Sequence, residues 1–565
     1  MKNALFIVFS LCIHITYAQD IHSIWTKTYG NETTDESPKG ITVNNDKELI
    51  ITGSFTETID FDPNEPVEEH TSNGSYDIYI QKLNEDGSLD WIKSIGGGGN
   101  DTPYAITVDD AGHIYVGGGF SDTVDFDPGV GEVIRMSEDF HDAFLLKLDP
   151  SGNFEWVNTF GSDSGDGLEK IRIGDDGNVY AVGSFSGTVD VQEGPGETLL
   201  SSIGLTDIFI AKYNSAGELF WANSIGTDSF DYVYGLEIDS EDDIIISGIY
   251  FEDMDVDPSG DEYVLEVGGY NKNYIIKYDN FGELIWAKDF GDEEYFNNNY
   301  DLAIDSDDNI YAIGGFFGSA DFNPGPGTAI FNSIGEEYNN YFLKLDSDGD
   351  YIRAETIGNS TGDVTIPDME IDAEDNLYFT GYFTTTVDFE IGAGSTELTS
   401  NGEYDYVILR MDENFDLVWA ESMGGINYDL GYELAVTNDG QLFTAGIYND
   451  VVDFNPNEGV NEFTSNGLKD IFVQKIVPAF ASVEQFDEED IHTVFPNPTA
   501  HEINITLNEK ETYLISLYDI SGKKIVEKSI ENTSVYILEM PNDTGMFILE
   551  IRDSNSLFTK KIIKY

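Results

Sequence analysis

The sequence predicts an all-β protein built from seven copies of one four-stranded unit, and three observations lead to this fold class. An aromatic residue recurs about every 65 residues, in the order Trp25, Trp91, Trp156, Trp221, Trp286, Tyr351 and Trp419. Between these positions apolar and polar residues alternate, which is typical of short strands. Glycine- and aspartate-rich turns separate the strands and return in the same order in each copy, so the chain is a repeat protein.

Each copy contains four expected strands, which in the second copy lie at 105–109, 113–120, 142–148 and 154–158. The seventh copy ends with its third strand near Ile476, whereas an unmatched fourth strand, 24–29, precedes the first copy. A closed ring needs this split, because pairing the two ends completes the last sheet and leaves only short edges. An open solenoid would gain nothing from it and would need polar caps. We therefore predict a seven-bladed β-propeller over residues 20–478, closed by the N-terminal strand.

Residues 1–18 have the composition of a secretory signal peptide. Lys2 precedes an apolar stretch, 4–15, and the small residue Ala18 before Gln19 marks the expected cleavage site. The stretch is too short for a permanent transmembrane helix. The only cysteine, Cys12, could mark a lipoprotein anchor, but the residues before it do not form a lipidation motif. We expect a secreted, monomeric protein without disulfides or a transmembrane segment.

The chain is strongly acidic, with a formal net charge of −80. Residues 20–493 contain 18 Lys and Arg against 97 Asp and Glu, while residues 494–565 contain 8 against 10. This charge argues against nucleic acid or an anionic membrane as a partner. It also predicts self-repulsion that salt or bound cations would relieve.

Three features place a domain boundary after residue 478. The acidic segment 484–490 suggests a solvated linker, 479–492. The last 72 residues hold 8 of the 26 basic residues that follow the signal peptide. Six strand-like runs then follow at 502–507, 513–520, 523–530, 535–540, 546–551 and 558–565. We therefore predict a second, small Ig-like β-sandwich over residues 493–565.

Motifs in this second domain carry a more specific resemblance. Pro496-Asn497-Pro498 sets a rigid entry before a strand, Gly522 lies in a hairpin turn, and Gly545 precedes the apolar run 546–549. In this order the motifs resemble the type A C-terminal sorting domain of the type IX secretion system of Bacteroidetes. The resemblance implies export across the outer membrane by that machinery, followed by release or attachment to the cell surface. An ordinary accessory sandwich is the alternative.

Two acidic series recur along the predicted propeller. The first follows the second strand of each copy, and its candidate Ca²⁺ ligands are Asp60, Asp62, Asp125, Asp127, Asp255 and Asp257. Alternate oxygens on a loop suit a hard cation, but short carboxylates also stabilise turns by bonding their own backbone. The second precedes the first strand, at Asp35, Asp101, Asp166, Asp231, Asp363 and Asp429, with Asn297 in the fifth copy. These residues could bind a ligand at the channel mouth or link neighbouring blades.

Motifs for catalysis are not found in the sequence. The seven histidines lack metal-ligand spacing, and no nucleophile elbow, phosphate loop or dinucleotide fingerprint occurs. Because repetition marks architecture, function is expected where copies differ, as in the longer loop 291–300 or at Tyr351. We expect no enzyme activity and no certain cofactor, but a binding or scaffold module for adhesion, a glycan or a surface protein. The alternative is an extracellular polysaccharide-degrading enzyme with its site at the channel mouth.

Overall fold

A computed structural model shows an all-β chain whose described residues fall into two compact units, one within Asp20–Pro478 and the other within Ala479–Tyr565. The described residues are 21–31, 36–62, 67–138, 140–192, 194, 196–291, 297–335, 338–392, 394–456, 460–478, 493–495, 502–506, 512–519, 524–531, 535–541, 545–552 and 557–564. No helix occurs in these ranges, so none there is long and apolar enough to cross a membrane.

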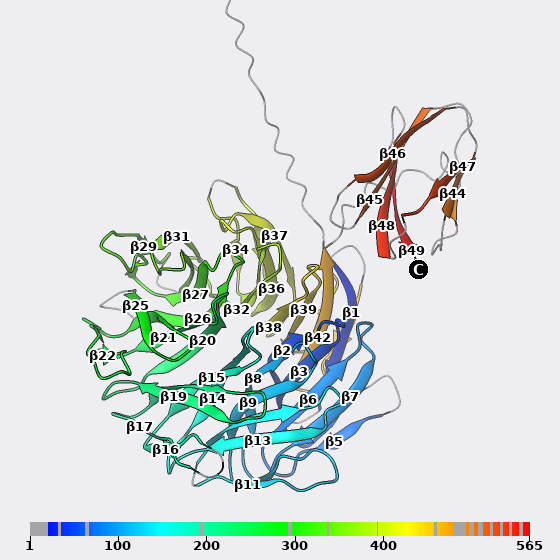
Figure 1. Ribbon diagram of the computed structural model, residues 1–565. Coiled ribbons are helices and arrows are strands. Elements are labelled where there is room, and N and C mark those ends of the chain that lie inside the picture. Colours follow the sequence, from blue (N-terminus) through cyan, green and yellow to red (C-terminus); the bar gives the residue numbers. More distant parts are fainter. Residues whose placement is uncertain are drawn as a thin grey trace, which may run out of the picture. The chain divides into compact units, whose positions relative to one another are not determined.

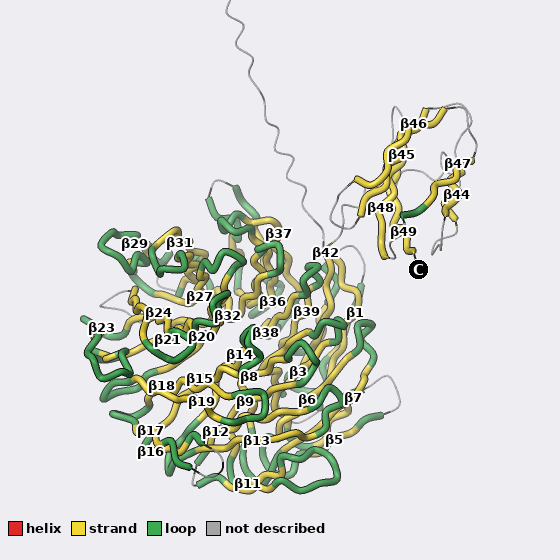
Figure 2. The backbone as a smooth tube through the Cα atoms, in the orientation of Figure 1, coloured by secondary structure: helices red, strands yellow, loops and turns green. Residues whose placement is uncertain are grey.

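Four-stranded antiparallel sheets repeat along the larger unit, and sheet 2 is typical of them. Its strands are β8 (Thr102–Val108), β9 (Ile114–Phe120), β12 (Asp142–Leu148) and β13 (Phe154–Phe160), paired in the order β8-β9-β12-β13. Valine, isoleucine and aromatic residues favour these pleated strands, and both faces of β9 and β12 are buried. Short turns connect the first strand to the second and the third to the fourth, whereas a longer segment joins the second to the third (Figure 2).

The other six sheets of the described region follow the same order. Sheet 1 contains β2 (Ser37–Val43), β3 (Leu49–Phe55), β6 (Asp77–Leu83) and β7 (Leu89–Ile95); sheet 3 contains β14 (Gly167–Ile173), β15 (Val179–Phe185), β18 (Asp207–Tyr213) and β19 (Leu219–Ile225); sheet 4 contains β20 (Tyr232–Ile238), β21 (Ile244–Tyr250), β24 (Lys272–Tyr278) and β25 (Leu284–Phe290). Sheet 5 contains β26 (Asn297–Ile304), β27 (Ile310–Phe316), β30 (Asn339–Leu345) and β31 (Tyr351–Ile357); sheet 6 contains β32 (Val364–Ile371), β33 (Leu377–Phe383), β36 (Asp405–Met411) and β37 (Leu417–Met423); sheet 7 contains β38 (Leu430–Val436), β39 (Leu442–Tyr448), β42 (Asp470–Pro478) and β1 (Ile21–Tyr29).

The sheets are arranged around a common axis like the blades of a propeller (Figure 1). The first strands of neighbouring sheets contact one another in the cyclic order β2, β8, β14, β20, β26, β32, β38 and back to β2. A separate hydrophobic core fills the space between each pair of neighbouring sheets, and the core between sheets 7 and 1 contains Phe443 and Val473 together with Ile51 and Tyr79. Burial between sheets is therefore the main source of stability.

The first strand of the unit completes the last sheet. Strand β1 pairs antiparallel with β42, with Ile21 opposite Pro478 and Tyr29 opposite Ile471. Ile21 and Tyr29 are buried, and Trp25 packs against the core between sheets 7 and 1. The two ends of the unit are thus held together by main-chain hydrogen bonds as well as by apolar burial.

The polar loop after the second strand of each sheet differs from the sequence expectation, because it forms a short hairpin. The hairpins are β4 (Thr58–Asp60) with β5 (Glu69–Thr71), β10 (Thr123–Asp125) with β11 (Ile134–Met136), β16 (Thr188–Asp190) with β17 (Leu199–Ser201), β22 (Met254–Asp255) with β23 (Val264–Leu265), β28 (Ser319–Asp321) with β29 (Ile330–Asn332), β34 (Thr386–Asp388) with β35 (Glu397–Thr399), and β40 (Val451–Asp453) with β41 (Glu462–Thr464). Val124 and Phe126 are fully buried, so the hairpin also contributes to the core.

The recurrent tryptophans connect neighbouring sheets. The indole N–H of Trp156, in the outermost strand of sheet 2, donates to Ser215 O in the turn of sheet 3 at 3.2 Å. The same bond is made by Trp25, Trp91, Trp221 and Trp286. The indole N–H of Trp419 has no partner among the described residues. Sheet 7 has no turn between its third and fourth strands, because β1 comes from the other end of the chain.

The smaller unit contains two antiparallel sheets. One has the order β43-β44-β47, with β43 (Thr493–Phe495), β44 (Glu502–Thr506) and β47 (Val535–Glu539). The other has the order β46-β45-β48-β49, with β45 (Thr512–Asp519), β46 (Lys524–Glu531), β48 (Gly545–Arg552) and β49 (Leu557–Lys564). Ile503 and Leu538 of the first sheet share one hydrophobic core with Ile515, Leu517 and Leu549 of the second.

Candidate functional site

The aspartates that follow the second strand close the short hairpins. Oδ1 of Asp125 accepts hydrogen bonds from Asp127 N at 3.1 Å and Val133 N at 2.8 Å. The first aspartate of each hairpin makes the same two bonds, two and eight residues further on, at Asp60, Asp190, Asp255, Asp321, Asp388 and Asp453. This is the geometry of a side-chain-stabilised turn.

The partner aspartates of this series lie on the hairpin loops. Oδ1 of Asp127 accepts from Gly129 N, and Oδ1 of Asp257 accepts from Ser259 N. Asp62 follows the buried Phe61. No group of three or more His, Cys, Asp or Glu side chains suited to a metal ion occurs in the described parts of the chain. Calcium binding by these loops stays a prediction.

Three members of the second acidic series connect neighbouring sheets. Asp101 Oδ2 accepts from Gly97 N at 2.7 Å, and its Oδ1 accepts from Ser121 N at 3.0 Å. Gly97 follows the last strand of sheet 1, whereas Ser121 follows the second strand of sheet 2. Asp166 and Asp429 make equivalent pairs of bonds. Burial raises the pKa of Asp101 and Asp166 to about 6 and that of Asp429 to about 7.

The other members of this series are bonded differently. Asp231 Oδ2 accepts from the backbone N–H and hydroxyl of Thr227, and burial raises the pKa of Asp231 to about 7. Asp363 Oδ2 accepts from the Tyr404 hydroxyl at 2.8 Å, and Asn297 donates from its amide to Asn271 O. Asp35 lies outside the described residues. The buried acid that directly precedes strand β2 is Glu36.

The expected processing and sorting residues can be placed only in part. Gly545 is the first residue of β48. Ala18, Gln19, Pro496, Asn497, Pro498 and Gly522 lie outside the described residues. Residues 292–296 of the expected long loop 291–300 lie outside them as well, whereas its residues 297–300 belong to strand β26.

Charged side chains that do not follow the repeat meet at the axis of the sheets. We call this set the axial cluster; it consists of Lys170 and Arg172 in β14, Glu237 in β20, Asp301 in β26, Asp368 and Glu370 in β32, and Glu433 in β38. Lys170 Nζ lies 3.2 Å from Asp301 Oδ1, although their sheets, 3 and 5, are not neighbours. This ion pair shows that the first strands direct these side chains toward one another across the axis.

The axial cluster is organised by ion pairs and backbone donors. Both Nε and Nη2 of Arg172 bond Glu237 Oε1, at 3.0 Å and 2.7 Å. The backbone N–H of Met369 donates to Asp301 Oδ2, and that of Leu434 donates to Asp368 Oδ2. The side chains of Lys170 and Arg172 keep 27 % and 29 % of their surface exposed, so solvent and small groups reach the cluster.

Carboxylates outnumber cations in the axial cluster, and their pKa values reflect it. Burial raises the pKa of Glu370 to about 8, with Arg172 opposing the shift and Glu237 adding to it. Burial likewise raises the pKa of Glu433 to about 7, opposed by Lys170 and Lys39. Asp368 is also raised well above its usual pKa, by burial and by the neighbouring Asp301 and Glu433. Glu370 and Glu433 therefore change protonation near neutral pH.

A collar of tyrosines lies in the same first strands. Tyr104, Tyr234, Tyr300 and Tyr432 occupy corresponding positions in sheets 2, 4, 5 and 7. Tyr432 contacts Tyr382 with ring centroids 6.3 Å apart. Burial raises the pKa of Tyr104, Tyr234 and Tyr300 to about 12, so these phenols stay neutral and can donate hydrogen bonds.

Sequence reasoning missed the axial cluster, although one signal for it was present. The apolar residues of the first strand repeat from copy to copy, whereas the positions between them vary. At one of these positions sheets 1 and 2 have Thr42 and Thr107, whereas sheets 3, 4 and 6 have Arg172, Glu237 and Glu370. The charge at this position changes from copy to copy, while the apolar residues on either side of it are repeated. Such variation indicates a functional role rather than a structural one.

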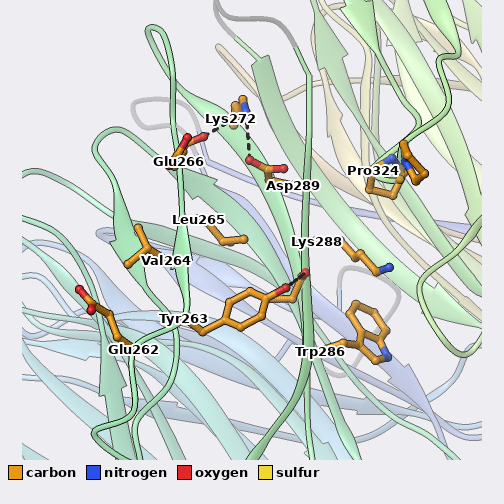
Figure 3. Close-up of a pocket in the computed structure, with 13 residues that line it drawn as sticks. Glu262, Tyr263, Val264, Leu265, Glu266, Lys272, Trp286, Lys288, Asp289 and Pro324 are labelled. Carbon is orange, nitrogen blue, oxygen red and sulfur yellow. Dashed lines mark hydrogen bonds and ion pairs between the residues drawn. The ribbon is translucent and has the colours of Figure 1, made fainter.

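A groove of about 740 Å³ lies on the outer part of sheet 4 (Figure 3). Lys272 takes the position that Asp142 has in sheet 2, and its Nζ bonds Asp289 Oδ2 and Glu266 O, both at 3.0 Å. The Tyr263 hydroxyl donates to Ala287 O. Lys272, Asp289 and the Tyr263 hydroxyl thus have partners within the groove, and Trp286 and Lys288 bond Ser347 and Asp350 beside it. The axial region is therefore the stronger candidate site.

Comparison with known proteins supports the assignment of the smaller unit. A protein-family model described as "Secretion system C-terminal sorting domain" matches residues 493–565. These residues are a type IX secretion sorting domain, and the protein is secreted by that system to the extracellular space or the outer-membrane surface.

About three quarters of the chain is similar to a WD-repeat protein. The chain is 22% identical over 512 residues to an uncharacterized WD repeat-containing protein of Acanthamoeba polyphaga mimivirus. The match covers 76% of this chain and 36% of the viral protein, so the chain spans little more than a third of that relative.

Two crystal structures of proteins of unknown function show only weak similarity. The protein from Bacteroides caccae is 10% identical with a TM-score of 0.29, over 61% of this chain and 89% of that one. The protein from Bacteroides thetaiotaomicron is 10% identical with a TM-score of 0.26, over 79% of this chain and 100% of that one. Similarity at this level carries no inference about function.

Proposed function

We propose that the protein is an exported, monomeric binding module: a seven-bladed β-propeller that recognises its ligand at the mouth of the central axis, followed by an Ig-like β-sandwich for sorting. The observation that carries this proposal is the tyrosine collar beside an unrepeated, partly exposed charge cluster. Aromatic rings with a few convergent polar groups are typical of binding sites. The ligand is a glycan or a surface protein, met during adhesion or scaffolding outside the cell.

The proposal is tested by probing the purified mature chain on glycan and protein arrays. We expect saturable binding that is weakened by Arg172→Ala, because this change leaves Glu237 without its cation. A suitable control is Lys288→Ala in the outer groove, which should bind as the wild type does. Parallel arrays with Ca²⁺ and with EDTA test the predicted calcium dependence. Absence of binding on both arrays would contradict the proposal.

A second function, degradation of an extracellular polysaccharide, is favoured by one observation. Glu370 and Glu433 have raised pKa values of about 8 and about 7, within the range that a general acid needs at neutral pH. Incubation with soluble polysaccharides and measurement of new reducing ends separates the two functions. Turnover that Glu433→Gln abolishes would establish the enzyme and remove the binding-only proposal.

A further inference from the structure

An aromatic row runs from the rim of sheet 4 toward the axis. We define it as Phe230, two residues before β20, and Tyr232 and Tyr234 at the start of β20, with Phe251 and Tyr270 beside them. The rings of Phe230 and Tyr232 are nearly parallel, at 3°, with centroids 6.3 Å apart, and those of Tyr232 and Tyr234 are 6.2 Å apart at 27°. Tyr232 and Tyr234 are alternate residues of β20 and point to the same face, and the ring of Phe230 lies nearly parallel to that of Tyr232.

Flanking rings widen the row at its outer end. Phe251 lies edge-on to Tyr232 with centroids 6.4 Å apart, and it also contacts Tyr270 at 6.0 Å. Phe230 is 44% exposed and Tyr270 is 59% exposed. Several large rings with exposed faces on one side of a soluble protein indicate an interaction surface.

The row is absent from the first three copies, although the fifth copy has Phe317 at the position of Phe251 and the seventh has Tyr428 at that of Phe230. In the first three copies the position of Tyr232 is occupied by Ser37, Thr102 and Gly167. The position of Phe251 is occupied there by Thr56, Ser121 and Ser186. All six residues are small or polar. Asn100 and Gly165 stand where the fourth copy has Phe230. Those copies form their sheets without the rings, so packing of the sheet does not require them.

The backbone beneath the row is held in place. The Tyr274 hydroxyl, from the third strand of the sheet, donates to Tyr232 O at 3.0 Å. Asp231 N donates to Thr206 O at 2.9 Å, and Phe230 forms a bridge with the loop at Thr206. A preorganised surface loses little conformational entropy on binding.

At its inner end the row reaches the axial region. The pKa of Tyr234 is raised by burial and further by Tyr232, Glu169 and Tyr300, which come from sheets 4, 3 and 5. An extended ligand that lies on the exposed rings would therefore also reach the neutral phenol hydroxyls at the axis.

We propose that the aromatic row binds a neutral polysaccharide chain, an inference that rests on the proposed binding function and narrows its ligand class. The apolar C–H faces of sugar rings pack on aromatic faces, while the tyrosine hydroxyls supply hydrogen bonds to sugar hydroxyls. The large negative charge of residues 20–493 repels polyanions, so acidic and sulfated polysaccharides are excluded. Export to the cell exterior brings this surface to where polysaccharides occur.

The test uses the full-length mature chain in affinity electrophoresis and calorimetry with hydroxyethyl cellulose, galactomannan and laminarin as neutral probes and alginate as the anionic probe. We expect at least one neutral probe to bind and alginate not to bind. Phe230→Ala and Tyr270→Ala should each weaken binding about tenfold, the effect of losing the apolar contact of one ring. Both side chains are exposed, and unchanged melting temperatures will verify folding.

Phe140→Ala is the matched control. Phe140 is 62% exposed and lies two residues before the third strand of sheet 2, as Tyr270 does in sheet 4. Binding by Phe140→Ala should stay within twofold of wild type. Failure of every neutral probe, binding of alginate, or equal losses in Phe140→Ala and Tyr270→Ala would overturn the proposal.

The outcomes separate this inference from the function on which it rests. If the chain binds array proteins but no polysaccharide, the proposal that it is a binding module is supported, and the proposal that the aromatic row binds a polysaccharide is overturned. If the chain binds a neutral polysaccharide and also degrades it, the proposed role of the aromatic row is supported, and the proposal of a binding function without catalysis is overturned. Absence of any binding partner on either array would overturn both.

Discussion

At the residue scale, five of the six tryptophans join the outermost strand of one sheet to the turn of the next. The bond needs a carbonyl in that turn, and five tryptophans have one. Trp419 keeps the ring without the bond, because sheet 7 receives its fourth strand from the N-terminus. The tryptophan side chain thus both packs between sheets and donates a hydrogen bond. Only the packing is present at all six tryptophans.

Replacing Trp156 by benzothienylalanine, an isostere with sulfur in place of the indole N–H, tests this bond. We expect a loss of about 1 kcal/mol in the free energy of unfolding, because Ser215 O loses its donor while the packing is kept. The same replacement at Trp419 should cost nothing or stabilise the protein, since it removes an unpaired N–H. Denaturant unfolding measures both changes, and equal losses at the two sites would contradict the role assigned to the bond.

Asp231 predicts a pH dependence of stability. A carboxyl whose pKa is raised on folding, here to about 7, binds its proton more tightly in the folded state. Its contribution to stability is complete below the unfolded pKa of 3.8 and is lost as the pH rises through about 7. The melting temperature should therefore fall between pH 5 and pH 8. Asp231→Asn should reduce this fall and stabilise the protein at pH 8, by on the order of 1–2 kcal/mol.

The matched control for Asp231 is Asp101. Asp231 Oδ1 has no hydrogen-bond partner among the described residues, and sheet 5 has Asn297 at the corresponding position. Both oxygens of Asp101 instead accept backbone N–H groups. Asp101→Asn would place an amide donor against one of them, so it should destabilise the protein at every pH. Stabilisation by Asp101→Asn would show that burial alone governs these carboxyls.

At the element scale, β1 decides whether the circle of sheets is closed. Without it β42 would expose an unpaired edge, and the core between sheets 7 and 1 would lose Tyr29 and the cover of Trp25. The short hairpins are a second structural element, and three-residue strands are too short for alternation to identify them. Their buried Val124 and Phe126 look in sequence like parts of an acidic loop.

Removal of residues 1–30 should open the circle. We expect a lower melting temperature and concentration-dependent association through the free edge of β42. A synthetic peptide of residues 21–30 added in excess should restore the melting temperature, whereas a scrambled peptide of the same composition should not. Calorimetry and size-exclusion chromatography measure the two effects, and an unchanged melting temperature after the deletion would show that β1 contributes no stability.

At the scale of the whole molecule, the net charge of −80 governs stability and solubility. Acidic side chains cover a unit with few cations, and their mutual repulsion acts within a screening length of about 10 Å at 0.1 M salt. Solvent-exposed charges respond to salt, while buried ones such as Asp231 respond mainly to pH.

The melting temperature should therefore rise by several degrees as NaCl increases from 0.05 M to 1 M, since the screening length then falls to about 3 Å. Tetramethylammonium chloride should act equally, because screening does not depend on the cation. CaCl₂ and MgCl₂ compared at one ionic strength then test the loop aspartates. An effect of Ca²⁺ above that of Mg²⁺ would support the calcium prediction, and equal effects would remove it.

The sequence by itself determined the all-β class, the repeat and the sorting domain. Apolar alternation, the tryptophan period and the terminal motifs are local or periodic patterns. Such patterns can be recognised in the amino-acid sequence without knowledge of the tertiary structure. It also indicated that Asp101 and its counterparts could link sheets. The changing charges of the first strands are visible in the sequence, but only the tertiary structure shows that these side chains meet at the axis and that the aromatic row stacks. Lys170 and Asp301 are 131 residues apart and meet because the first strands converge on one axis. Convergence of side chains across a ring depends on the closure of the whole chain and leaves no pattern within a single copy.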